Sequence, residues 1–220
     1  MALLIKAAPD LLSGLLVTLL IGAGAAVLAT AAAFVAGLAS HARSRAVRVP
    51  ARIYIEVFRG TSALVQLYFL FYVLPLLGVL LPAWAVGILG LGLCIGAYGA
   101  VVVTAAVGAV PPGQKEAAAA LGLRPMQAMR LVVLPQALRV MLPQFGNLSV
   151  ELLKATALVS LITLHDLTFE AQMFNQETLH TAEAFLTILV VYYLLAQGIM
   201  RGFGVLQARF DVGARGGHVL

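Results

Sequence analysis

Long apolar stretches set the strongest limit on what this chain can fold into. Each is near or above the ~20 residues that cross a bilayer as a helix. Short breaks containing Pro or Gly separate them, such as LPLLGVLLP at 74–82 and VPPGQ at 110–114. The sequence therefore predicts an all-α membrane protein, a single transmembrane domain over residues 1–220 with five transmembrane helices. The expected spans are residues 11–38, 54–81, 83–109, 145–164 and 184–206.

The composition is that of a membrane protein and not of a soluble one. Hydrophobic residues make up 62% of the chain and charged residues 10%, against about 45–50% and 25% in soluble domains. The single cysteine, Cys94, lies in an apolar stretch, so neither a disulfide nor a cysteine-based metal site is expected. The first span is rich in Gly and Ala, which favours close helix packing in lipid.

The basic residues predict the orientation in the membrane. Of the 14 basic residues, all except Lys6 and Lys154 lie in the first connection, the third connection and the C-terminal tail. They are Arg43, Arg45, Arg48, Arg52, Arg59, Lys115, Arg124, Arg130, Arg139, Arg201, Arg209 and Arg215. The fourth connection, residues 165–183, has acidic residues but no Lys or Arg. The positive-inside rule then places the N-terminus outside and the C-terminus in the cytoplasm. The net charge of +5 thus comes from basic residues that gather on one side of the membrane, and no nucleic acid partner is expected.

The third connection, residues 111–144, is the unusual part of the chain because it is charged and rich in Ala. Pro111-Pro112-Gly113 ends the third span, and we expect a helix to restart near Gln114. Glu116 would then lie in its first turn, where a carboxylate interacts favourably with unpaired N–H groups.

We expect Gly122 to end this first helix and Pro125 to begin a second one at a tolerated position. Leu134-Pro135 is expected to break the chain again. The sequence therefore predicts two short cytoplasmic helices lying along the membrane surface. They form either an amphipathic interfacial linker or a docking element for a soluble partner.

The spacing within this connection resembles that of a known family. Glu116-Ala117-Ala118 is followed by three residues, Gly122, nine residues and Val132-Val133-Leu134-Pro135. This resembles the EAA loop, E-A-A-x3-G-x9-I-x-L-P, of bacterial ABC import permeases, with Val in place of Ile. RGTSALVQLYFLFYVLP (59–75) and LPQALRVMLPQFGN (134–147) are similar to the polar amino acid uptake subfamily. The resemblance covers nearly the whole chain.

The resemblance implies the transmembrane subunit of an ATP-driven type I importer in the bacterial cytoplasmic (inner) membrane. Two permease subunits, identical or different, would form the pore, and two ATPase subunits would receive the EAA loops as coupling helices. An extracytoplasmic solute-binding protein would deliver an amino acid. The residues implied to transmit the motion are Glu116, Ala117, Ala118, Gly122, Leu134 and Pro135. This chain would then be no enzyme and need no cofactor or metal, because ATP and Mg²⁺ bind the partner ATPase.

The chain departs from the family pattern at several positions. After Gly96-Ala97-Tyr98, Val101 and Thr104 stand where many relatives have Glu and Arg. Ser62 replaces the usual Pro, and Ala157 replaces a Ser. We therefore hypothesise a companion permease of different sequence that keeps the missing Glu and Arg.

Charged residues in the fourth span are candidates for the translocation path, because ionisable groups at bilayer depth are costly and often functional. Glu151 and Lys154, at i and i+3, share a helix face and can pair. They would either contact a solute's ammonium and carboxylate, with Asn147 and Thr156 nearby, or form a structural ion pair.

Two further polar residues lie within the spans. Gln66 and Tyr98 either face the path or pack with a satisfied hydrogen bond. Glu56 and Arg59, one turn apart, are expected to pair on the cytoplasmic side. The acidic fourth connection is either a solvated loop or the place where a binding protein docks.

Other functions agree less well with the sequence. An ion-coupled secondary transporter usually has repeated halves, whereas this chain has an odd number of expected spans and an unexplained charged connection. No P-loop, H-E-x-x-H or G-x-S-x-G motif is present, which leaves a membrane enzyme without support. For an importer, the solute stays open between a polar amino acid, a zwitterionic compatible solute and an opine-like derivative.

Overall fold

The computed structural model describes residues 2–212, and side chains over residues 7–210. Arg215, counted above among the cytoplasmic basic residues, lies outside the described residues. All regular elements in the described part are helical. They are α1 (Ala2–Ala39), α2 (Arg45–Gly60), α3 (Ala63–Tyr68), η1 (Phe69–Val73), η2 (Leu74–Leu77), α4 (Ala83–Ala109), α5 (Pro112–Ala120), α6 (Pro125–Ala128), η3 (Met129–Val133), α7 (Leu134–Ala155), η4 (Thr156–Ile162), α8 (Leu167–Thr178) and α9 (Thr181–Val212).

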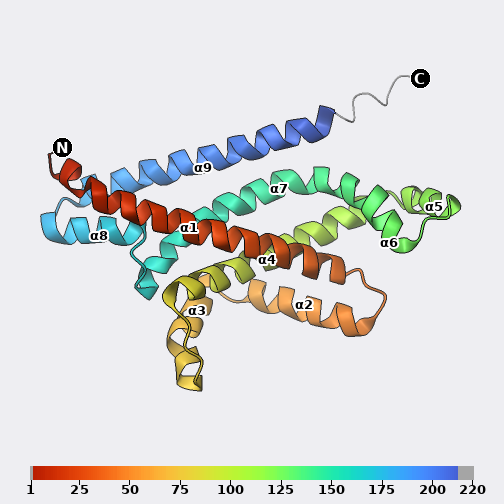
Figure 1. Cartoon of the computed structure of the whole chain (residues 1–220), viewed down its shortest axis with the longest axis horizontal. Coiled ribbons are helices and arrows are strands. Elements are labelled where there is room, and N and C mark those ends of the chain that lie inside the picture. Colours follow the sequence, from red (N-terminus) through yellow and green to blue (C-terminus); the bar gives the residue numbers. More distant parts are fainter. Residues whose placement is uncertain (1, 213–220) are drawn as a thin grey trace.

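The long helices α1, α4, α7 and α9 run along the length of the molecule, as Figure 1 shows. The short helices α5 and α6 lie at one end, and α8 lies at the other end with the start of α1. Four helical stretches are long and apolar enough to cross a membrane alone: Ala7–Ala39, Ala83–Ala109, Pro125–Ile162 and Thr181–Phe210. The third expected span, 83–109, has the same limits as α4.

In the structure, the second span is not the continuous helix that the sequence predicts over residues 54–81. Arg45–Gly60 and Ala63–Leu77 form a pair bent by 104°, so the described residues hold four helices long and apolar enough to cross a membrane, or five candidates if this pair counts as one. Thr61 and Ser62 between them are extended, and the Thr61 hydroxyl donates to the Val57 carbonyl at 2.8 Å. The extended backbone at these two residues ends α2, and the Gln66 side chain bonds the carbonyls of Phe58 and Thr61 that the break leaves free.

Two π-helical turns each precede a Leu-Pro pair. Leu74 and Leu134 donate their N–H groups five residues back, to the carbonyls of Phe69 and Met129. The wider turn makes room for the proline ring, which otherwise clashes with the preceding turn. After Pro75 the helical segment ends in a 3₁₀ turn at Gly78. After Leu134-Pro135, by contrast, the chain stays helical to Ile162. The break predicted at Leu134-Pro135 is therefore wrong.

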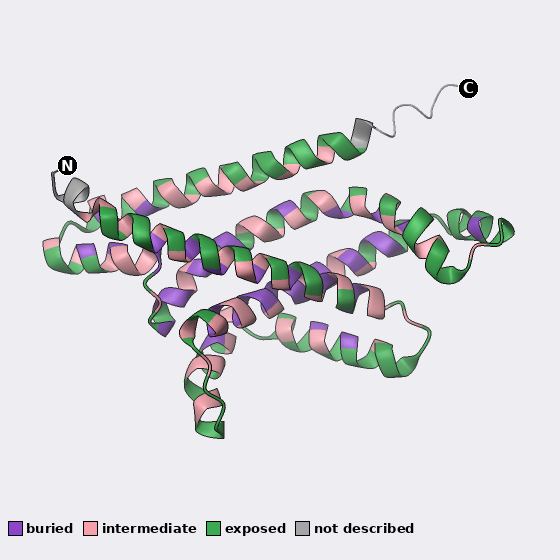
Figure 2. Cartoon of the chain, viewed as in Figure 1, coloured by how far each residue is buried: buried purple, intermediate pink, exposed green. Residues whose placement is uncertain are grey.

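Helices α1 and α4 pack closely because their contact is built from small residues. A Cβ added to Gly37 would lie 2.6 Å from the Val103 Cβ and 2.9 Å from the Ala100 carbonyl oxygen. This is the close approach that the Gly- and Ala-rich first span predicts. Burial concentrates on α4, while α9 is mostly exposed or half-buried in the isolated chain (Figure 2). The exposed faces are therefore left for lipid or for other subunits.

Candidate functional site

The tip of the molecule is formed by α5 and the turn after it. The helix begins at Pro112, two residues earlier than expected, so Glu116 lies in the second turn rather than the first. Gly122 ends α5 with φ +75°, as the sequence predicts. The N–H groups of Gly122 and Leu123 donate to the carbonyls of Ala119 and Ala118, at 2.9 and 3.1 Å. This pairing closes the helix by a glycine C-cap.

The second expected short helix is the start of a long one. The Arg124 N–H donates to Gln127 Oε1 at 2.9 Å and so fixes the start of α6. The chain then runs through η3 directly into α7. Gln136 Nε2 donates to Gln114 Oε1 at 3.3 Å, which links α7 back to α5. The tip is thus one short helix tied to the end of a span.

The tip presents apolar side chains outward. Among the predicted coupling residues, Ala118 is buried and Leu134 half-buried, whereas the others are exposed: Glu116, Ala117, Gly122 and Pro135. The large apolar side chains beside them are 81% exposed at Leu121, 70% at Met126 and 66% at Leu131. We call Glu116, Ala117, Leu121, Met126 and Leu131 the coupling surface. Exposed apolar groups gathered in this way mark a surface that another protein or the membrane covers.

Three predicted path residues lie on one face of α7. Asn147, Glu151 and Lys154 are four and three residues apart, so they share a side of the helix, and all are exposed in the isolated chain. Among the side chains described, Glu151 and Lys154 form no ion pair with one another. Thr156 does not join them: it is fully buried, and its Oγ1 donates to the Leu153 carbonyl at 2.6 Å.

Of the other two path candidates, Tyr98 lies on α4 and Gln66 on α3. Gln66 Nε2 donates to the Phe58 carbonyl at 2.9 Å and to Thr61 Oγ1 at 2.8 Å. The Tyr98 ring lies beneath the guanidinium of Arg59, with 5.4 Å from Arg59 Cζ to the ring centroid. Arg59 does not make the expected pair with Glu56, and no motif or spacing in the sequence indicates that it lies at a candidate site.

The fourth connection folds into α8 instead of a loop. Asp166 caps this helix, because its Oδ1 accepts the Phe169 N–H at 3.0 Å. Its carboxyl is fully buried, and desolvation by that burial raises its pKa to about 6. Thr18 Oγ1 accepts the Leu167 N–H at 3.1 Å, which ties α8 to α1.

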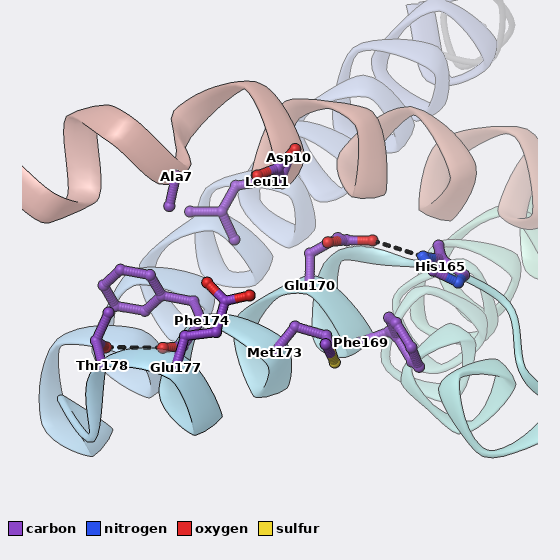
Figure 3. A pocket seen from close by; sticks show the side chains of 10 residues that line it. All are labelled: Ala7, Asp10, Leu11, His165, Phe169, Glu170, Met173, Phe174, Glu177 and Thr178. Carbon is purple, nitrogen blue, oxygen red and sulfur yellow. Dashed lines mark hydrogen bonds and ion pairs between the residues drawn. The ribbon is translucent and has the colours of Figure 1, made fainter.

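A cavity of about 420 Å³ opens between α8 and the start of α1, at the end opposite the tip (Figure 3). Its charged lining is acidic, from Asp10, Glu170 and Glu177, and aromatic and aliphatic side chains form the rest of the wall. The carboxylates of Glu170 and Glu177 extend from α8 toward α1. His165 Nδ1 lies 3.0 Å from Glu170 Oε1, the only ion pair among the described side chains.

The chain is similar in sequence to a known protein family and to known transport proteins. Residues 29–211 match the family model described as the binding-protein-dependent transport system inner membrane component. The probable amino-acid ABC transporter permease protein y4tF of Sinorhizobium fredii is 46% identical over 150 residues, 66% of this chain and 63% of that protein. This chain thus spans somewhat less than two thirds of that relative.

Two further similarities extend over more of the chain. The octopine transport system permease protein OccM of Rhizobium radiobacter is 34% identical over 206 residues, 90% of this chain and 84% of that protein. The crystal structure of an amino acid ABC transporter with histidines is similar with a TM-score of 0.86 and 32% identity. That similarity covers 94% of this chain and 96% of the other.

Proposed function

This chain belongs to the binding-protein-dependent transport system inner membrane component family, and on that premise we propose that it passes a polar amino acid or a related zwitterion into the cell. It is a multi-pass subunit of the inner membrane with the fold of a type I ABC importer permease. It is not itself an enzyme, because in such permeases the ATPase is a separate subunit. The family assignment argues against the ion-coupled alternative.

The coupling surface is the observation that supports an ATP-driven mechanism best. It carries large exposed apolar side chains at the end of the molecule, beside the helix α5 that Gly122 closes and that is tied to α7. Arg43 and Lys115 line a common cavity behind α5, so the basic first connection lies at the same end. We therefore place this end in the cytoplasm, against an ATPase subunit.

The face of α7 that carries Asn147, Glu151 and Lys154 supports a translocation path between two permease subunits. A charged side chain at the centre of a membrane helix costs about 2.5–3.5 kcal/mol on the insertion scale. Two unpaired charges on one exposed face are therefore unfavourable against lipid. They are compatible with a water-filled path shared with a second subunit, which in our proposal is a companion with a different sequence.

The acidic cavity supports an extracytoplasmic docking surface. It lies at the end opposite the coupling surface, and its charged lining residues are Asp10, Glu170 and Glu177. A binding protein that presents Lys or Arg side chains would complement it. In this arrangement the solute enters near α8 and leaves near α5.

The solute is proposed from the relatives. The y4tF protein is named as a probable amino-acid permease, which favours a polar amino acid. The similarity to the octopine permease supports an opine-like amino acid derivative as the second candidate. Both solutes carry an ammonium and a carboxylate group.

Reconstitution of the purified complex tests the function. The tagged chain is isolated with its ATPase, companion permease and binding protein, placed in proteoliposomes, and supplied with labelled polar amino acids. We expect uptake that needs both ATP and the binding protein, and a Glu116→Ala variant that assembles but takes up little. Uptake driven by an ion gradient without ATP would contradict the proposal. Calorimetry on the binding protein with amino acids and opines then separates the two solute classes.

A further inference from the structure

Polar groups gather midway along α4, one of the most apolar helices of the molecule. Cys94 and Tyr98 lie one turn apart near the middle of this 27-residue helix, about 6 Å along its axis. The Arg59 guanidinium lies over the Tyr98 ring. One turn away, the Phe58 carbonyl accepts from Cys94 Sγ at 3.9 Å and from Gln66 Nε2 at 2.9 Å. The bend between α2 and α3 thus carries polar side chains to the middle of a span.

Arg59 is a cation without a counter-ion at this depth. No carboxylate among the described side chains lies within ion-pair distance of it, and its side chain is exposed in the isolated chain. Its contact is the face of Tyr98, which leaves the edge of the guanidinium and its donors open. An intramembrane Arg of this kind faces the interior of an assembled bundle, where it finds an anionic partner.

Gln66, which lies at the same bend, has a side-chain oxygen that accepts no hydrogen bond from the described residues. Its Nε2 donates to Phe58 O, Thr61 Oγ1 and Thr61 O at 2.9, 2.8 and 3.3 Å, and so satisfies carbonyls freed by the helix break. These bonds fix which way the carboxamide points. Its Oε1 is left buried with no hydrogen-bond partner. A buried acceptor without a donor is unfavourable, and more so at membrane depth, where no water replaces the missing bond.

We propose that Arg59 binds the carboxylate of the transported solute and that Gln66 Oε1 accepts a hydrogen bond from its ammonium. This rests on the proposed function, because it needs a zwitterionic solute. The planar guanidinium matches a carboxylate with two parallel hydrogen bonds. Both side chains lie at the bend between α2 and α3, Arg59 against Tyr98 and Gln66 against the Phe58 carbonyl, so one solute at the bend can contact both. Arg59 and Gln66 are then specificity-determining residues, held at the bend of a broken span.

The test compares Arg59→Gln with Arg52→Gln, a control that removes an exposed Arg two turns earlier on the same helix. Uptake into proteoliposomes is measured with labelled L-glutamine, L-glutamate and L-arginine, and the best-transported one is used for the variants. We expect Arg59→Gln to raise the half-saturating concentration about 10- to 100-fold, as loss of a hydrogen-bonded charge does. Arg52→Gln should leave it unchanged, and Gln66→Leu should raise it less than Arg59→Gln does.

A second readout separates recognition from structure. The solute and its carboxamide analogue, which lacks the carboxylate, are added directly to the purified complex, and their stimulation of ATPase activity is compared. The wild type should prefer the carboxylate, and Arg59→Gln should lose that preference while the complex still assembles. An unchanged preference, or a lower maximal rate with an unchanged half-saturating concentration, overturns the inference. If the wild type takes up none of the three amino acids, the amino acid function itself fails.

Discussion

Replacing Gly122 by Ala tests whether the end of α5 depends on a backbone conformation that only Gly adopts easily. Gly122 has φ +75°, and nothing lies within 4 Å of a Cβ built on it, so the substitution changes backbone strain and not packing. A side chain in this left-handed conformation costs about 1–2 kcal/mol. That corresponds to a shift of about 5- to 30-fold in the equilibrium between the closed and the frayed helix end.

Gly113→Ala is the matched control. Gly113 lies in the same helix and also has open space around its Cβ, but it is not among the residues with positive φ. Ala there should favour the helix slightly, by up to about 1 kcal/mol. The two Gly-to-Ala changes, one inside this nine-residue helix and one just after it, are therefore expected to act in opposite directions.

Amide hydrogen exchange in the intact complex measures this directly. The Leu123 N–H, bonded to the Ala118 carbonyl at 3.1 Å, reports opening of the α5 end. We expect its exchange to rise about 5- to 30-fold in Gly122→Ala, a range set by the strain estimate. The uptake rate should fall with it. Equal exchange in Gly122→Ala and Gly113→Ala would refute the reasoning.

Three more outcomes are expected from other parts of the chain. Lys154→Ala should abolish uptake while assembly and basal ATPase activity persist, whereas loss of assembly would favour a structural role. Burial raises the pKa of Asp166 from 3.8 to about 6, so ionisation opposes folding and wild-type stability falls as pH rises through that window; Asp166→Asn should therefore gain melting temperature relative to wild type at pH 8 but not at pH 4. Gly37→Ala places a Cβ 2.6 Å from the Val103 Cβ and should cost about 1–3 kcal/mol, whereas Gly108→Ala, with open space around it, should leave the melting temperature unchanged.

The limits of the spans could be predicted where the chain marks them chemically. Pro82 and Val110-Pro111 flank α4, and its limits agree with the prediction because Pro82 stands just before the first turn and Pro111 disfavours the helical conformation at Val110. The bend at Thr61-Ser62 could not be predicted in the same way. Apolar residues continue on both sides of it, and its direction depends on hydrogen bonds from Gln66 and Tyr54 to carbonyls of other helical segments.

Some residues of the candidate site can be predicted from local spacing, and others cannot because their positions depend on how helices pack. The helix end at Gly122 follows from local spacing and is confirmed, whereas the helix begins two residues earlier than expected. The coupling role of Glu116 stays a prediction. The position of Arg59 depends on which helix lies across from it. The spacing of one helical turn predicts that it pairs with Glu56 on the cytoplasmic side. Only the packing of α2 on α4 brings it to Tyr98. Thr156 was misassigned because periodicity does not tell a buried face from an open one.

The π-helical turn η3 has a consequence for insertions and deletions. Each residue of an α-helix turns the chain by about 100° and advances it about 1.5 Å. The five-residue turn η3 absorbs one extra residue, so deleting one residue there restores an ordinary turn, whereas deleting one from the ordinary turn α6 would rotate everything before it, α5 included, by about that angle around the axis of α7. The exposed side of α5 that carries Ala117 would then face a different direction. The number of residues between Gly122 and η3 thus sets the azimuth of the tip, and a length change there would point it away from its partner even with every side chain intact.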